Sequence, residues 1–555
     1  MSKFVVEIEP KKDFPDESFK STIQENSKFT DDCIYTDQED YFLFLDGVIL
    51  NKRELIHSRE IENWQSCIIN LYQKEGDAFF DLLRGSYVGL MFDKNADKWL
   101  IFSDHIGSKP IYYHSKNNKI YISNSYTELV NTLKANSISV SLNREAAYLL
   151  LTYGFVFEEI TILNEINRLK IGYFAIIENN KFKEKEFFKL ENDPIEITEG
   201  EAINEIDKRF RNATHLAFKK DQEYNLKHLV SLSGGLDSRM TSWVAHEMGY
   251  TDQLNITYSQ SNYLDETIPK KIAEDLKHEW FFKALDNGLF LNEIDNITKI
   301  SGGNVLYYGL AHSFSFYKYL CFNEMGMLHT GQLGDVVLGT FSKEDRNKEY
   351  KFGDGAYSCR LLHKCDESTI SDSYDNQEIF KMFIRGFYGA NQGLLSIQQY
   401  TETYSPFYDI DFMTFALSLP IEMRFNHNLY KKWIIDKYPH AANYIWESTK
   451  SKITDWHIKI GNKEISVRQL PKKILNHLGI SSYGTDTKNH MNPLDYWYNN
   501  NLDLRSFQDE YFESNISRLN DYPELKEDCI KLYKKGNGVE KNQVLTLIST
   551  MKQFF

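Results

Sequence analysis

The chain has 555 residues, of which 42% are hydrophobic and 26% charged, so it can build buried cores and does not have the composition of a disordered protein. At about 150 residues per domain, the length predicts three or four domains, or two if these are large α/β units. Lysine and arginine number 64 against 79 acidic residues, and the resulting net charge of −15 disfavours binding to a nucleic-acid backbone.

The cysteines and the first residues indicate a reducing, cytoplasmic location. The six cysteines are scattered, without a C-x-x-C pair or a histidine at zinc-finger spacing, which predicts neither a zinc site nor a disulfide framework. The start, MSKFVVEIEPKKDF, lacks the apolar stretch of a signal peptide. The longest apolar run, AAYLLLTYGFVF, is shorter than the roughly 20 residues that span a bilayer. We therefore expect neither membrane nor nucleic-acid partners.

Short β-type runs dominate residues 1–190. They are KFVVEI, YFLFLDGVIL, SYVGLMFD, KWLIFSD, PIYYH, KIYISNS and YFAIIEN, several bounded by Gly, Asn or Asp. This pattern predicts an antiparallel, strand-rich first domain. The segment that follows, ENNKFKEKEFFKLENDPIEITEGE, is polar and charge-rich and is expected to contain the linker.

From about residue 200, amphipathic helical segments alternate with the brief apolar runs HLVSL, QLNIT and MLHT. This alternation is typical of a parallel sheet with crossover helices, and it predicts an α/β domain over residues 200–470. Residues 471–555 have a helical pattern, since KEDCIKLYKKG stops at Gly536 and VLTLISTMKQFF repeats apolar residues at helical spacing. We expect a helical C-terminal extension packed on the second domain.

The most informative stretch is LKHLVSLSGGLDSRMTSWVAHEMGY, in which a β-type run enters a Gly-rich turn and a helix follows. Glycine has no Cβ, so the backbone N–H groups of such a turn can approach an oxyanion, and the helix N-terminus favours phosphate. Serine hydroxyls add donors, and the aspartate can bind a phosphate-bridging Mg²⁺. A Gly-Gly turn alone often serves packing only, but the full string S-G-G-x-D-S is stronger evidence for a phosphate-binding turn.

This string resembles the pyrophosphate loop of the ATP pyrophosphatase superfamily, whose members make adenylates, and the resemblance implies an ATP site. Farther on, MGMLHTGQLGDVVLGT predicts a buried strand followed by Thr330, Gly331 and Asp335, and here the chain resembles the asparagine synthetases. The resemblance implies that Asp237 and Asp335 share Mg²⁺, whereas Asp335 alone is equally well explained as a helix N-cap. The residues predicted to contact ATP are Leu232, Ser233, Gly234, Gly235, Asp237, Ser238, Thr257, Thr330 and Gly331.

Three further positions concern catalysis. TETYSPFYDIDFMTFALSLP resembles the family's Glu-x-x-x-Pro-Phe-x-Asp segment, which implies that Glu402 is the catalytic carboxylate; a lone loop glutamate is otherwise solvated. A family lysine that stabilises the adenylate corresponds to Lys450 or Lys452 in WESTKSKI, although either is also consistent with a solvated surface lysine. Gln332 stands where asparagine synthetases have Glu and β-lactam synthetase has Tyr, and it cannot accept a proton at neutral pH.

The first domain resembles the class II glutamine amidotransferase domain fused to asparagine synthetases, an Ntn-hydrolase-like α+β sandwich. The matching residues are 46–55, 82–113 and 161–173. Active domains of this class use an N-terminal cysteine, exposed by removal of the initiator methionine, but this chain has Ser2. The family's Asn-Gly-Glu is replaced by Asp46-Gly47-Val48, and Cys33 lacks a free α-amine. We therefore expect a degenerate domain that does not hydrolyse glutamine; hydrolysis by Ser2 is the alternative.

Together these features predict an ATP- and Mg²⁺-dependent amide ligase that makes an acyl-adenylate, AMP and pyrophosphate. The carboxylate substrate is a small molecule, a glycan or a peptide. The amine is ammonia, a second substrate or a group of the same molecule, and the last case is the one found in β-lactam synthetase and lasso-peptide cyclases. An ATP-binding pseudoenzyme or regulatory protein is the alternative, favoured by Gln332 and Ser2 and disfavoured by the joint presence of Asp237, Asp335 and Glu402. A tRNA-thiolating relative would need a reactive cysteine pair and a basic surface, and neither is present.

Overall fold

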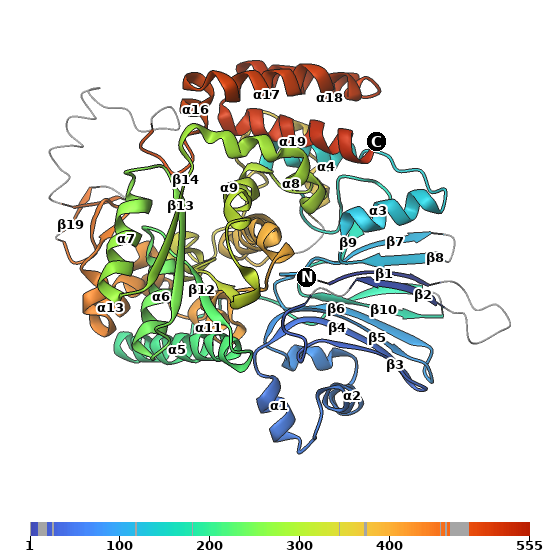
Figure 1. Cartoon of the computed structure of the whole chain (residues 1–555), viewed down its shortest axis with the longest axis horizontal. Coiled ribbons are helices and arrows are strands. Elements are labelled where there is room, and N and C mark those ends of the chain that lie inside the picture. The colour runs from blue at the N-terminus through green and yellow to red at the C-terminus, as the bar shows by residue number, and fades with distance from the viewer. Residues whose placement is uncertain are drawn as a thin grey trace.

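The computed structural model describes residues 2–8, 19–24, 27–116, 119–179, 181–342, 345–370, 374–455 and 488–555, and the backbone of the hairpin strands β19 (His457–Ile460) and β20 (Lys463–Ser466). A β-sandwich lies beside an α/β unit, and the helices that end the chain lie along one side of the molecule, at the top of Figure 1. None of the described helices has the length and apolarity needed to cross a bilayer.

Two antiparallel sheets form the N-terminal sandwich. The first has the order β2-β1-β8-β7-β9 and comprises β1 (Lys3–Ile8), β2 (Phe19–Gln24), β7 (Tyr112–Lys116), β8 (Lys119–Ser123) and β9 (Asn167–Arg168). The second has the order β11-β10-β6-β5-β4-β3 and comprises β3 (Ile34–Asp37), β4 (Tyr41–Ile49), β5 (Gly85–Asp93), β6 (Lys98–Ser103), β10 (Tyr173–Glu178) and β11 (Lys181–Glu186). Phe4, Leu90 and Ile122 belong to the core between the sheets. Helices α1 (Lys52–Ser58) and α2 (Trp64–Glu75) cover the outer face of the second sheet.

All seven expected β-runs form strands of this sandwich. The segment interpreted as a linker also contains a strand, because β11 occupies residues 181–186. β11 pairs with β10 alone, at the edge of the sheet, and its side chains are exposed or half-buried. A charged edge strand lacks the apolar alternation that marks a buried one. The connection to the next unit is therefore shorter than the sequence suggested.

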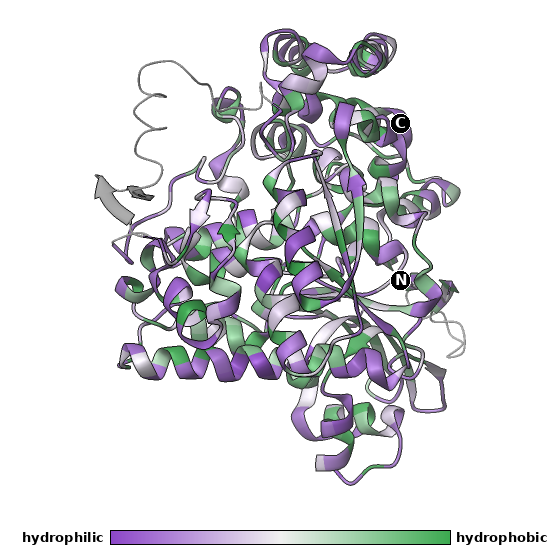
Figure 2. Cartoon of the chain, turned by 60° about the vertical axis from the view of Figure 1, so that its left-hand side comes forward, coloured by the Kyte–Doolittle hydropathy of each residue, from purple (hydrophilic) through white to green (hydrophobic). Residues whose placement is uncertain are grey.

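A five-stranded parallel sheet forms the centre of the second unit. Its order is β14-β13-β12-β15-β16, with β12 (Lys227–Ser231), β13 (Gln253–Ser259), β14 (Glu279–Ala284), β15 (Met325–His329) and β16 (Thr403–Tyr404). The crossover helices include α6 (Leu236–Glu247) and α7 (Leu264–Leu276), whereas α5 (Glu199–Glu223) precedes β12. The helices of this unit interleave hydrophobic with hydrophilic residues in Figure 2. The chain leaves β12 toward β13 and returns on its other side as β15, which creates a crevice at the carboxyl ends of these strands.

Four helices end the chain: α16 (Leu494–Asn500), α17 (Leu502–Asn515), α18 (Pro523–Lys535) and α19 (Gly538–Phe554). They pack on both units and not on the second alone. Helix α19 contacts α8 (Ile294–Ser301) of the second unit and α4 (Arg144–Tyr153), which lies between β8 and β9 in the sequence of the first unit, and the Tyr148 hydroxyl donates to Asp528 at 3.1 Å. The start of the predicted extension, residues 471–487, lies outside the described residues.

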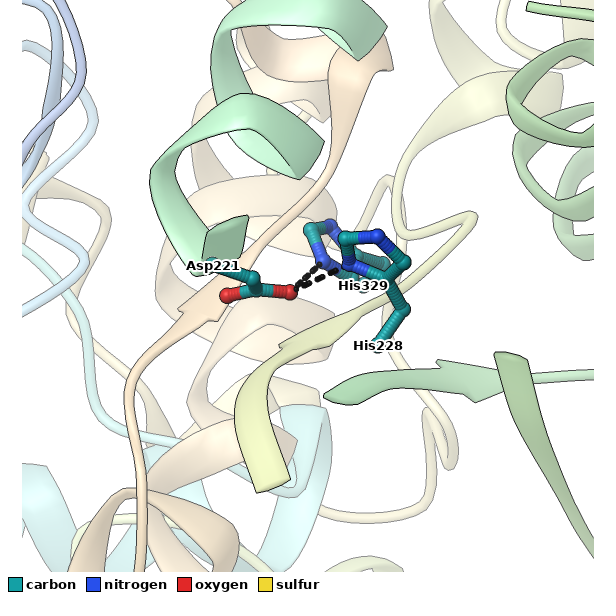
Figure 3. A group of neighbouring side chains, drawn as sticks. All are labelled: Asp221, His228 and His329. Carbon is teal, nitrogen blue, oxygen red and sulfur yellow. Dashed lines mark hydrogen bonds and ion pairs between the residues drawn. The ribbon is translucent and has the colours of Figure 1, made fainter. Parts of the chain in front are cut away.

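A buried triad ties α5 to the central strands, as Figure 3 shows for Asp221, His228 and His329. One oxygen of the Asp221 carboxylate lies 2.9 Å from His228 Nδ1 and 2.7 Å from His329 Nε2, and the other accepts the Met327 N–H at 3.0 Å. These are hydrogen-bond distances, so a carboxylate shared by two imidazole N–H groups accounts for the cluster. The triad fixes β12 and β15 next to each other just before both predicted ATP motifs.

Several buried imidazoles make the fold sensitive to acid. Burial lowers the pKa of His329, and it lowers the pKa of His278 and that of His312 to about 4 each. Their folded-state pKa values lie below the ordinary value of about 6.5, so the unfolded chain binds more protons, and stability is lost as the pH falls from about 6.5 toward 4. Asp221 adds to this loss only at lower pH: burial alone would raise its pKa, but the two histidines bring it below the usual value.

We expect the urea midpoint of unfolding to be clearly lower at about pH 5 than at about pH 7.5. His278→Gln should reduce this difference because it removes one neutral buried imidazole, whereas His57→Gln, at an exposed position, should leave it unchanged. An identical midpoint at both pH values would contradict the prediction.

Candidate active site

A cavity of about 470 Å³ opens at the carboxyl ends of β12, β13 and β15. Of the predicted residues, its lining includes Leu232, Ser233, Gly235, Asp237, Ser238, Thr257, Thr330, Gly331 and Gln332. The two sequence motifs, separated by almost a hundred residues, therefore meet at one cavity. Its position is the one at which open parallel sheets bind ligands.

The loop at the end of β12 is closed by its own serines. The Ser238 hydroxyl accepts the Ser233 N–H at 2.9 Å and lies 2.9 Å from the Ser233 hydroxyl, which in turn accepts the Gly235 N–H at 3.2 Å. Gly235 precedes helix α6, and its first turn receives no side-chain cap. The first N–H groups of a helix have no partner within the helix, so this end of α6 can bind an anion.

The second motif packs directly on the loop, and its two glycines permit the contact. A Cβ at Gly331 would lie 2.3 Å from the backbone nitrogen of Ser238, and a Cβ at Gly334 would lie 2.7 Å from Asp237 Cγ. Both distances are shorter than van der Waals contact, so only glycine fits at either position. The T-G-x-x-G-D string is thus a packing requirement for bringing Asp335 beside Asp237.

Asp237 and Asp335 form an acidic pair at this contact. Burial, followed by the neighbouring Asp335 carboxylate, raises the pKa of Asp237 well above its usual value, although the Tyr430 hydroxyl donates to it at 2.8 Å. Asp335 accepts the Thr340 hydroxyl at 2.7 Å and makes no side-chain N-cap bond, so the N-cap explanation does not describe its contacts. Of the two, Asp237 lines the cavity and Asp335 lies behind it, outside the lining. Two neighbouring carboxylates suit an oxygen-seeking divalent cation such as Mg²⁺.

Two acidic residues of the cavity were not identified from the sequence. Asp265 accepts the Gly234 N–H at 2.8 Å, and burial together with the Glu447 carboxylate raises its pKa to about 6. Glu447 accepts the Tyr263 hydroxyl, and its backbone N–H donates to Gly234 O at 3.1 Å. Gly234 is hydrogen-bonded to both of these acidic residues, and it is not itself part of the cavity lining. In the sequence, Asp265 looks like an ordinary acidic residue in a first helical turn, and no local signal marks Glu447.

Gln332 lines the cavity but is tied to its wall. Its side-chain amide donates to Ala390 O at 2.7 Å, and its backbone oxygen accepts the Ser405 hydroxyl at 2.9 Å. A glutamine held in this way can orient a bound group by its remaining hydrogen-bonding capacity, and it cannot take up a proton.

Glu402 is buried, as expected of a functional carboxylate, but it faces the N-terminal sandwich and is not part of the cavity lining. Its Oε1 lies 2.8 Å from Lys109 Nζ, and its Oε2 makes no hydrogen bond within the described residues. The sequence placed Glu402 in the synthetase site because of its motif. The structure adds the ion pair with Lys109, which no local pattern indicates, and the catalytic role of Glu402 stays a prediction.

Neither candidate lysine lines the cavity. Lys452 lies at a separate hollow that includes Trp243 and Tyr444. Lys450 adopts a left-handed backbone conformation, with φ of 55°, and its N–H donates to Trp446 O at 2.7 Å. Glu447 of the same segment reaches the cavity, but the choice between Lys450 and Lys452 stays open.

In the sandwich, Ser2 is buried and hydrogen-bonded to Asp46. Burial alone would raise the pKa of Asp46, but the Lys109 ammonium at 3.2 Å and the Ser2 hydroxyl keep it below the usual value. Cys33 Sγ lies 3.8 Å from Asp46, and burial raises the pKa of this thiol to about 12. A thiol that stays protonated is a poor nucleophile, which supports the view that Cys33 does not replace the missing N-terminal cysteine.

Comparisons with known proteins find one family model and two curated relatives that match parts of this chain. Residues 20–188 match the model of the glutamine amidotransferase domain. Asparagine synthetase [glutamine-hydrolyzing] 1 of Bacillus subtilis is 22% identical over 270 residues, which are 47% of this chain and 42% of the relative. Asparagine synthetase B [glutamine-hydrolyzing] of Escherichia coli is 28% identical over 104 residues, 18% of this chain and 19% of the relative. The matched region thus spans less than half the length of either relative.

Two solved structures overlap weakly. They are the glutamine phosphoribosylpyrophosphate amidotransferase from B. subtilis complexed with ADP and GMP, and an allosteric regulatory enzyme of purine biosynthesis. Their sequence identities are 9% and 8%, and each has a TM-score of 0.23. Each match covers 51% of this chain, and 59% and 74% of the respective structures. Overlap at this level does not define a shared fold.

The close contact at Gly331 gives a direct test of the cavity. Gly331→Ala should weaken binding of Mg·ATP by about tenfold or more, because the added Cβ pushes the second motif away from the loop. Gly309→Ala is the matched control: Gly309 lines the same cavity, and its Cβ would meet nothing within 4 Å. Isothermal titration calorimetry measures both affinities, and equal weakening in the two variants would contradict the prediction.

Proposed function

We propose that this relative of the asparagine synthetases is an ATP-dependent amide ligase that activates a substrate carboxylate as an acyl-adenylate and transfers the acyl group to an amine or ammonia. The observation that supports the proposal is the packing of Gly331 and Gly334 against the 233–238 loop, next to a cavity that Asp237 lines and with Asp335 as the neighbour of Asp237. A general nucleotide pocket does not require a pair of carboxylates beside the loop.

In the proposed reaction, an oxygen of the substrate carboxylate attacks the α-phosphorus of ATP and pyrophosphate leaves. The amine then attacks the acyl carbon, AMP leaves, and the amine loses a proton. The 233–238 loop and the first turn of α6 bind the pyrophosphate. Asp237 and Asp335 would hold Mg²⁺, which neutralises phosphate charge when bound.

The proton of the attacking amine needs an acceptor other than Gln332. Glu402 is the proposed acceptor, because its Oε2 lacks a hydrogen-bond partner within the described residues. Lys450 or Lys452 is the proposed cation for the adenylate. Substrates in the proposed range are small-molecule, glycan or peptide carboxylates.

We further propose that glutamine is not the nitrogen source. Asp46 replaces an asparagine of the active domains, and its carboxylate binds Lys109 and Ser2. A carboxylate at this place offers no amide N–H to an oxyanion, so it does not provide the donor that glutamine hydrolysis needs. The amine therefore comes from free ammonia, a second substrate or the activated molecule itself.

An ATP-binding regulatory protein is the second candidate. Two observations favour it: Gln332 cannot act as a base, and Glu402 is ion-paired outside the cavity lining. Such a protein would bind Mg·ATP without releasing pyrophosphate.

Pyrophosphate release from Mg·ATP decides between these functions. The purified protein is assayed against a panel of carboxylates and amines, with glutamine and ammonium as separate nitrogen sources. Asp237→Asn should abolish release while the far-UV circular dichroism stays unchanged, because one of the two proposed metal carboxylates is lost. Asp521→Asn, an exposed substitution, is the control. If Mg·ATP binds but none of the substrate pairs leads to pyrophosphate release, the result favours the regulatory protein.

Ser2→Ala tests the role of the first domain. We expect the rate of amide formation from ammonium or an amine to stay unchanged, and glutamate production from glutamine to be absent before and after the substitution. Glutamate formed by the unmodified protein and lost in the variant would show that Ser2 is a working nucleophile.

A further inference from the structure

The segment 402–409 connects the α/β unit to the sandwich through both of its acidic residues. Glu402 pairs with Lys109 at 2.8 Å. Seven residues later, Asp409 accepts Arg84 Nε at 3.1 Å as well as a second guanidinium nitrogen, and the Tyr404 hydroxyl at 2.7 Å. Both basic residues belong to the region matched by the amidotransferase model, so two cations of the first domain hold one segment of the second.

Lys109 is enclosed between the two domains. Its side chain is fully buried, and its ammonium lies 3.2 Å from Asp46 of the sandwich and 2.8 Å from Glu402 of the α/β unit. Burial alone would lower the pKa of Lys109, but Asp46 and Glu402 raise it well above the usual value, so the ammonium stays charged. The charged and titratable groups that act on this pair from neighbouring elements are Lys28, Cys33, Asp46 and Tyr408.

The same segment supports the wall of the cavity. The Leu328 N–H donates to Glu402 O at 2.8 Å, and the Thr330 N–H donates to Tyr404 O at 2.8 Å. Leu328 and Thr330 both line the cavity. A displacement of Glu402 therefore acts on β15 and on the start of the second ATP motif.

We propose that Lys109 is a positioning residue of the ligase: held by Asp46, it fixes the Glu402 carboxylate for the amide-forming step, so that the amidotransferase-like domain completes the ligase site. This inference rests on the proposed function, and in particular on the role of Glu402 as proton acceptor. It gives the first domain a function that needs neither an N-terminal cysteine nor glutamine.

A purely structural ion pair at the interface is the competing explanation. Removing one partner of a buried pair destabilises a protein in either case, because a charge is left uncompensated. The explanations differ in the pH profile of the reaction. Without the ammonium, a buried carboxyl favours its protonated form, which cannot accept the amine's proton.

The test uses the full chain with Lys109→Met, Lys109→Arg, Glu402→Gln and the double variant Lys109→Met/Glu402→Gln. Lys94→Met is the matched control, because Lys94 pairs with Asp37 at 2.6 Å on the surface of the same domain. The first measurement is the urea midpoint of all variants, which needs no substrate. The second is pyrophosphate release against pH, with the carboxylate and amine identified by the substrate panel.

In the first measurement, we expect Lys109→Met to lower the urea midpoint clearly and Lys94→Met to leave it nearly unchanged. The losses of Lys109→Met and Glu402→Gln should not add in the double variant. Additive losses would show that the two side chains are not coupled and would overturn the proposal, even if no substrate pair is found and the ligase function itself fails.

In the second measurement, the acid limb of the pH–rate profile should move to higher pH in Lys109→Met, with a loss of about tenfold or more at neutral pH. Lys109→Arg should restore the profile, because it keeps the charge. A lower rate with an unchanged pH–rate profile, or equal losses of rate in the Met and Arg variants, would show that Lys109 has a structural role only.

Discussion

The close packing of the second motif on the pyrophosphate-type loop is the contact on which the rest of the site depends. Because Gly331 and Gly334 have no side chains, the backbone of the second motif lies in contact with Ser238 and Asp237. This contact brings Asp335 next to Asp237. The buried Asp221–His228–His329 triad holds the two strands that deliver these motifs. The two carboxylates therefore meet only if the strands pair, the triad forms and both positions are glycine. A defect in any of these separates the two carboxylates.

The charge distribution around the cavity follows from this geometry. Asp237, Asp265 and Glu447 bring carboxylates to its lining, and no lysine or arginine lines it in the part of the chain that the structure describes. A triphosphate would be repelled by such a surface unless a cation came with it. The site therefore suits the magnesium complex of a nucleotide better than the free nucleotide, and the uncapped start of helix α6 supplies the complementary dipole.

Patterns of residues adjacent in sequence predicted much of the fold and the turn at residues 233–238. The β-runs of the sandwich, the strands β12, β13 and β15, and the turn at 233–238 depend on residues adjacent in sequence, so periodicity and glycine placement identified them. Strand β11 was missed because an exposed edge needs no apolar alternation. The resemblance to asparagine synthetases placed Glu402, but not its partner. Lys109 is almost three hundred residues away in sequence, and only the docking of two domains brings the charges together. Asp265 and Glu447 escaped detection because their contacts with Gly234 join segments of the second unit that are distant in sequence.

The position of helix α19 has a consequence for how the chain folds during synthesis. All eight residues from Ala146 to Tyr153 of α4 are buried, and α19 packs against that helix although it is far away in sequence. Lys134 likewise donates to the backbone oxygen of Phe554, 420 positions later, at 2.7 Å. Loops of this length cost entropy that is regained only when the distant partner arrives. The apolar α4 helix leaves the ribosome long before α19 is made, so the nascent chain exposes a hydrophobic surface, prone to aggregation, until α19 has been synthesised.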